Sequence, residues 1–108
     1  MPYFPKKDWT LLGFKKSNAK NKKIYALLEN KETKKTTRVH FGDSRYPSYR
    51  NTTGVYLSPS MIHGDSERRR LYKSRSKGKV RPDSYSASHF SFYYLWIVFY
   101  IFSVMVLY

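Results

Sequence analysis

The sequence has 108 residues, enough for one small domain, and its 21 Lys and Arg residues against seven Asp and Glu residues give a formal net charge of +14. Such a positive charge predicts an anionic partner: nucleic acid, anionic lipid or an acidic protein surface. The absence of cysteine excludes disulfides, thiolate metal sites and a cysteine nucleophile.

The first half of the chain predicts three antiparallel strands. Two short apolar stretches, WTLLGFKKS (9–17) and KIYALLEN (23–30), flank a turn-rich basic link, which is typical of a β-hairpin. A third strand is expected over 36–42, where apolar and polar residues alternate.

The middle of the chain predicts irregular structure followed by a helix. Pro47 and Gly54 interrupt the strand pattern, so we expect a loop or a short helix there. The stretch HGDSERRRLYKSRS (63–76) opens with residues that cap helices, places Glu67 in the first turn and continues with arginines. It therefore predicts a helix.

The last part of the chain divides into a linker and an apolar segment. Residues 77–89 are rich in Gly, Pro and Ser, which favours a linker. The predicted domains are then a basic α+β head over 1–76, a linker over 77–89 and a hydrophobic anchor over 90–108. The expected fold class is α+β, a small three-stranded antiparallel sheet followed by short helices and a C-terminal hydrophobic helix suited to crossing a membrane.

The expected anchor, FSFYYLWIVFYIFSVMVLY, has nineteen residues without a formal charge. As a helix it would be about 28 Å long, close to the roughly 30 Å hydrocarbon core of a bilayer. Because Lys and Arg precede it and none follows, a tail anchor with a cytosolic head is expected. Burial in a groove of a neighbouring protein, as helix or strand, is the alternative. The anchor residues are Phe90, Tyr93, Tyr94, Trp96, Ile97, Phe99, Ile101, Phe102, Val104, Leu107 and Tyr108.

Basic residues gather in the predicted hairpin and in the predicted helix, where ERRRLYKSR (67–75) concentrates arginines. Arginines can bind phosphates and carboxylates through paired hydrogen bonds, whereas such a cluster can also be a solvated helix face. The candidate residues for contact with an anionic partner are Lys15, Lys16, Lys20, Lys22, Lys23, Arg68, Arg69, Arg70, Lys73 and Arg75.

No pattern predicts catalysis or a cofactor, and no small-molecule substrate is expected. His40, His63 and His89 lack the spacing of metal ligands. Asp65 beside His63 is better explained as a helix cap than as half of an acid–base pair. Several aromatic residues could stack on bases, but we expect them to form the core. They are Phe14, Tyr25, Phe41, Tyr46, Tyr49, Tyr56 and Tyr72.

The motifs GFKKS, FGDSRY, HGDSERRRLY and FSFYYLW, in that order, resemble those of a family of short basic proteins of unassigned activity. These proteins are encoded by large DNA viruses of algae, other giant viruses and some marine phages. The likeness runs over 11–75 and 85–96, and it implies a virion component with no catalytic residues to carry over. Similar proteins tend to stop near YYLW, whereas this chain continues with IVFYIFSVMVLY (97–108).

These features together predict a minor capsid protein of a large icosahedral DNA virus, located between the outer capsid shell and the internal membrane. The head is expected to contact major and minor capsid proteins, and the C-terminal segment the viral membrane. The alternative is a basic protein that packages or condenses viral DNA, for which the apolar segment has no evident use.

Overall fold

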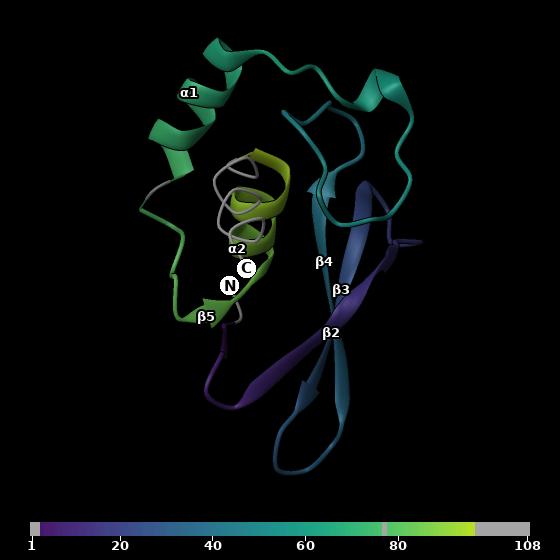
Figure 1. The fold of residues 1–108 in the computed structure, drawn as a ribbon, viewed down its shortest axis with the longest axis vertical. Helices are drawn as coiled ribbons and strands as arrows, with labels where there is room; N and C mark the ends of the chain where they lie inside the picture. The colour runs from purple at the N-terminus through teal and green to yellow at the C-terminus, as the bar shows by residue number, and fades with distance from the viewer. Residues whose placement is uncertain (1–2, 77, 97–108) are drawn as a thin grey trace, which may run out of the picture.

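Three antiparallel strands form one side of the protein, and the helices lie on the other (Figure 1). The structure, a computed structural model, describes residues 3–76 and 78–96. Strands β2 (Trp9–Lys16), β3 (Lys22–Asn30) and β4 (Thr36–Asp43) pair in the order β2-β3-β4. The predicted hairpin and third strand are therefore confirmed, and β3 is the central strand.

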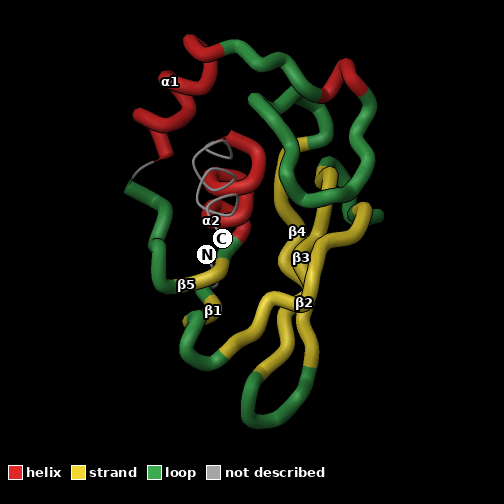
Figure 2. Tube along the Cα trace, in the orientation of Figure 1, coloured by secondary structure: helices red, strands yellow, loops and turns green. Residues whose placement is uncertain are grey.

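Short elements at the two ends of the described chain lie next to each other. Strand β1 (Phe4–Pro5) pairs antiparallel with β5 (Ser84–Tyr85). Helix α2 (Ala87–Ser91) follows β5 and runs directly into η2 (Phe92–Trp96), a turn of π-helix. Helix α1 (Ser66–Ser76) confirms the helix predicted from the capping residues and contacts η2, so α2 and η2 lie between α1 and the sheet (Figure 2).

The segment that joins β4 to α1 is a loop, with one short 3-10 turn, η1 (Pro59–Met61). Two hydrogen bonds tie it to the end of η2: the Arg50 N–H donates to the Leu95 carbonyl at 2.9 Å, and the Thr52 N–H donates to the Tyr94 carbonyl at 3.1 Å. These hydrogen bonds hold η2 against the loop.

The hydrophobic core lies between the sheet and the α2–η2 segment. A three-stranded sheet needs a cover for its apolar face to be stable in water. α1 provides none, because it has no buried residue. The cover comes instead from the C-terminal segment, and the core residues are Ile24, Ala26, Leu28, Val39, Phe41, Phe90 and Leu95.

Residues 90–96 correct the prediction that a membrane anchor begins at Phe90. Phe90 and Leu95 are completely buried inside the protein, while Tyr93, Tyr94 and Trp96 are partly buried. Tyr94 also packs on Phe14 of β2, and Trp96 on Tyr72 of α1. The remaining predicted anchor residues lie outside the described residues: Ile97, Phe99, Ile101, Phe102, Val104, Leu107 and Tyr108. Within residues 3–76 and 78–96, no helix is both long enough and apolar enough to span a bilayer.

The second half of the predicted linker is also part of the fold. Ser84, Ser86 and His89 are buried. The Ser86 hydroxyl accepts a hydrogen bond from the His89 N–H at 3.1 Å, which caps the N-terminus of α2. Ser84, which begins β5, and Ser86, which caps α2, were both predicted to be linker residues.

Candidate anion-binding site

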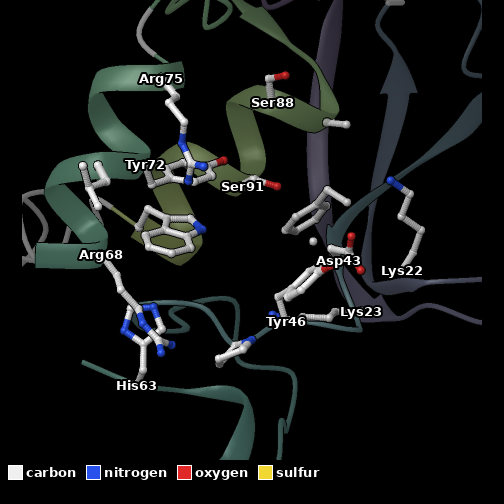
Figure 3. A pocket seen from close by; sticks show the side chains of 16 residues that line it. Lys22, Lys23, Asp43, Tyr46, His63, Arg68, Tyr72, Arg75, Ser88 and Ser91 are labelled. Carbon is white, nitrogen blue, oxygen red and sulfur yellow. The ribbon is translucent and has the colours of Figure 1, made fainter. Parts of the chain in front are cut away.

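A hollow of about 890 Å³ lies where the sheet meets the helices (Figure 3). Its volume falls in the range of about 300–1,000 Å³ that is typical of small-molecule sites. Arg68, Tyr72 and Arg75 line it from α1, and Ser88 and Ser91 from α2. The opposite wall is formed by the beginning of β3 and the end of β4, with the loop after β4. Residues distant in sequence therefore surround one space.

The walls of the hollow carry more positive than negative charge. Lys22, Lys23, Arg68 and Arg75 are its cations at neutral pH, and Asp43 is its one acidic residue. Asp43 is already paired outside the hollow, because Arg45 donates to its Oδ1 from Nε at 3.0 Å and to its Oδ2 from Nη2 at 2.8 Å.

These hydrogen bonds lower the pKa of Asp43 to about 2, so the carboxylate is charged at neutral pH. Because the Asp43 carboxylate is already paired with Arg45, the carboxylate neutralises the cations around the hollow only in part.

Lys23 is an uncommon buried lysine, with 5% of its surface exposed. Its Nζ donates to the Ser48 Oγ at 2.6 Å. Burial lowers its pKa to about 8, against the opposing effect of the Asp43 carboxylate, so the amine still carries a proton at pH 7. Ser48 is only 2% exposed and does not line the hollow, so its hydroxyl is not placed to attack a ligand there. The pair fastens the loop after β4 to the sheet.

His63 lines the hollow and carries one donor that has no partner within the described residues. Its Nδ1 accepts the Asp65 N–H at 2.8 Å, so the neutral ring carries its proton on Nε2. Burial, and next the charge of Arg68, lower the pKa of His63 and keep it neutral. The Nε2 atom is buried and has no hydrogen-bond partner within the described part of the chain. Sequence patterns gave no sign of this donor.

The predicted basic residues separate into two groups in the structure. Lys22 and Lys23 from the hairpin meet Arg68 and Arg75 from α1 around the hollow. The others lie elsewhere: Lys15, Lys16, Lys20 and Lys73 are exposed, Arg70 pairs with Glu67, and Arg69 contacts Trp96. Sequence spacing alone could not separate the groups, because the hairpin and α1 are brought together by the fold.

The residues HGD (63–65) have the capping role that the sequence predicts. The Asp65 Oδ1 accepts the N–H groups of Glu67 at 2.9 Å and Arg68 at 3.2 Å, the first unpaired donors of α1. The predicted core role of the aromatic residues is confirmed for Phe41 and Tyr25, which are buried, and not for Tyr46 and Tyr56, which are 62% and 76% exposed.

Trp96, the last described residue, is held by two contacts with α1. Its ring stacks on Tyr72, with ring centroids 4.2 Å apart and planes 5° from parallel. Its carbonyl accepts a hydrogen bond from the Arg69 Nε at 2.9 Å. The point from which the apolar stretch 97–108 continues is therefore fixed beside the arginine-rich helix.

Comparison of the chain with models of protein families, with curated proteins and with solved structures finds no match. The likeness of its motifs to the viral proteins stays a prediction.

Proposed function

We propose that this protein is a minor structural component of the virion of a large icosahedral DNA virus, linking capsid proteins to the internal membrane. The observation that carries the proposal is positive charge without internal compensation. The formal net charge is +14. Between residues of the described part, only three ion pairs form: Asp43 with Arg45, Asp65 with Arg68 and Glu67 with Arg70. Among the remaining cations, Lys15, Lys16, Lys20 and Lys73 are exposed and can face an anionic surface.

The position of Trp96 favours a surface that is both anionic and apolar. The uncharged stretch IVFYIFSVMVLY (97–108) begins where the arginines of α1 are concentrated. A lipid bilayer with acidic headgroups offers both chemistries, since each Lys or Arg near its surface contributes about 1 kcal/mol of attraction. Apolar side chains inserted beside these residues add hydrophobic burial. The membrane contact is thus assigned to residues from 97 onward, and residues 3–96 form the head that meets capsid proteins.

Flotation with vesicles tests the membrane contact. The full chain should float with vesicles that contain phosphatidylserine and less well with neutral vesicles. A chain that ends at Trp96 should stay in the dense fraction at moderate salt. This end point retains Phe90 and Leu95 in the core, whereas a chain ending at Ser88 would lose both and unfold. Circular dichroism checks that both chains are folded, and equal flotation of the two would refute the membrane contact.

A test of the capsid contact needs the virion itself. Chemical cross-linking of purified particles should join lysines of the exposed group, Lys15, Lys16 and Lys20, to acidic faces of capsid proteins. Cross-links to internal DNA-binding proteins alone would contradict a position beneath the shell.

DNA packaging remains the second candidate, because Tyr46 is exposed beside Arg45, whose guanidinium lies 5.7 Å from the centre of the tyrosine ring. Exposed aromatic rings next to cations suit base stacking. DNA binding that falls steeply with salt, weakens on Tyr46→Ala and persists in competition with anionic vesicles would favour this function over the membrane link.

A further inference from the structure

The cations around the hollow approach it from different elements. Lys22 and Lys23 belong to β3, and Arg68 and Arg75 to α1, so cations line the hollow from two sides (Figure 3). Lys22, Arg68 and Arg75 are exposed and Lys23 is buried. Arg68 also pairs with Asp65 at 3.9 Å. An anion that enters the hollow would be attracted by cations on both of its sides.

The chemistry of the donors favours a tetrahedral oxyanion. Guanidinium groups donate paired hydrogen bonds to phosphate, and an ammonium group supplies a compact charge. His63 also lines the hollow, but its Nε2 is buried, so a ligand would reach that neutral donor only if the ring turned. A phosphate monoester presents three free oxygens and can accept from several directions, whereas a carboxylate presents two in one plane.

Part of the wall is apolar. Phe41 is completely buried and offers no surface to a ligand, but Leu71, Tyr72 and Trp96 line the hollow together with the charged residues. A bare inorganic ion would leave these side chains unused, but a phosphate attached to a planar or aliphatic group would contact them. The mixture of apolar wall and few polar groups is typical of sites for small organic ligands.

We propose that this hollow binds the phosphate monoester group of an organic molecule, either a free metabolite such as a mononucleotide or the headgroup of a lipid such as phosphatidic acid. The hollow shares Arg68 and Arg75 with helix α1, which the proposed membrane contact also uses, but binding of a soluble phosphate does not depend on that contact. Long nucleic acid is a poorer fit, because its backbone follows open surfaces, whereas these donors surround a hollow.

Isothermal titration calorimetry of the full chain tests the proposal with three probes: inorganic phosphate, adenosine 5′-monophosphate and dihexanoyl phosphatidic acid. At least one organic phosphate should bind more tightly than inorganic phosphate. Tighter binding of the nucleotide identifies a free metabolite as the source, and tighter binding of the short-chain lipid identifies a headgroup. Absence of binding by both organic probes at millimolar concentration overturns the proposal.

Two variants of α1 distinguish binding in the hollow from general attraction by the positive charge of the protein. Arg75→Gln, at the hollow, should weaken binding of the organic phosphate about tenfold or more. Lys73→Gln removes the same charge from an exposed position of α1 that does not line the hollow, and should leave affinity within about twofold. Equal losses in the two variants would mean diffuse attraction and overturn the site.

The His63 ring gives a readout that does not depend on affinity. In imidazole nitrogen NMR spectra, the Nε2–H resonance should shift when the phosphate probe is added, while the resonances of His40 should stay in place. His40 does not line the hollow, and its Nδ1 is engaged with the Ser17 hydroxyl at 2.7 Å. Binding without any change at His63 would contradict the proposed position of the ligand.

Discussion

Replacing Phe90 by alanine tests whether the beginning of the apolar C-terminal segment is core or anchor. Phe90 is completely buried. Its ring meets Phe14 edge-on at 5.7 Å, lies 5.4 Å from Phe41 and stacks on Tyr85 at 5.4 Å. Truncation of a buried phenylalanine costs about 3–5 kcal/mol. Each lost aromatic pair adds about 0.5–1.5 kcal/mol beyond the buried area, so we expect the upper end of that range.

This cost is a large fraction of the roughly 5–15 kcal/mol that keeps a small domain folded. Because 1 kcal/mol shifts the Tm of a domain of this size by about 4–8 °C, Phe90→Ala should lower the Tm by more than about 12 °C. Urea and thermal unfolding of the chain ending at Trp96, followed by circular dichroism, measure the effect. The matched control is Tyr56→Ala, which removes an aromatic ring that is 76% exposed and should change stability by less than about 0.5 kcal/mol. Equal midpoints for the two variants would refute the assignment of residues 90–96 to the core.

Three further substitutions test the contacts around this core. Gly42→Ala should destabilise the fold more than Gly54→Ala. Both glycines have positive φ, +77° and +84°, but only at Gly42 would the added Cβ lie 3.1 Å from the Leu95 Cδ1. A lower urea midpoint for Gly54→Ala than for Gly42→Ala would contradict this. Burial lowers the pKa of His89 to about 4. Between the ordinary pKa of 6.5 and that value, the unfolded chain binds a proton that the folded chain does not, so stability is complete above about pH 6.5 and falls as the pH decreases. Urea unfolding should show a loss of about 2 kcal/mol between pH 7 and pH 4.5, absent in His89→Gln. Asp65→Ala should cost about 1 kcal/mol at the start of α1, seen as faster amide exchange there and unchanged exchange in the sheet.

The sequence predicted the sheet and α1 because their signals are local. In the third strand, Val39 and Phe41 point into the core and alternate with polar neighbours, as a strand with one buried face requires. At α1, the Asp65 side chain indicates where the helix begins, because it caps the N–H groups of Glu67 and Arg68 in the first turn. Neither assignment needed information from distant residues.

The sequence patterns do not predict that residues 84–96 belong to the fold of the head, because this role depends on residues that are distant in the chain. An uncharged stretch such as FSFYYLW is equally compatible with lipid and with the interior of a protein. The deciding fact lies in α1, whose only apolar residues are Leu71 and Tyr72 and which has no buried residue. Phe4, Val55 and Leu57 also pack against the core but are only partly buried, whereas Phe90 and Leu95 are completely buried in it. The small number of apolar residues in α1 is the sequence feature that points to Phe90 and Leu95 as core residues.

The hollow could be predicted only in part for the same reason. Its basic residues were identified individually, but β3 and α1 face each other only after α2 and η2 have packed between them. The His63 donor depends on a hydrogen bond to the Asp65 N–H and on burial, neither of which has a sequence pattern.

Trp96 takes part in both proposals, so separate tests of the two need substitutions at other positions. Its ring forms part of the wall of the hollow, and its carbonyl is bound by Arg69 where the stretch 97–108 begins. A substitution at Trp96 would disturb both regions and distinguish nothing. Arg75 lines the hollow and Lys73 does not, although both extend from α1. A membrane contact driven by the charge of α1 should respond equally to the loss of either cation, whereas a phosphate held in the hollow should respond to Arg75 alone.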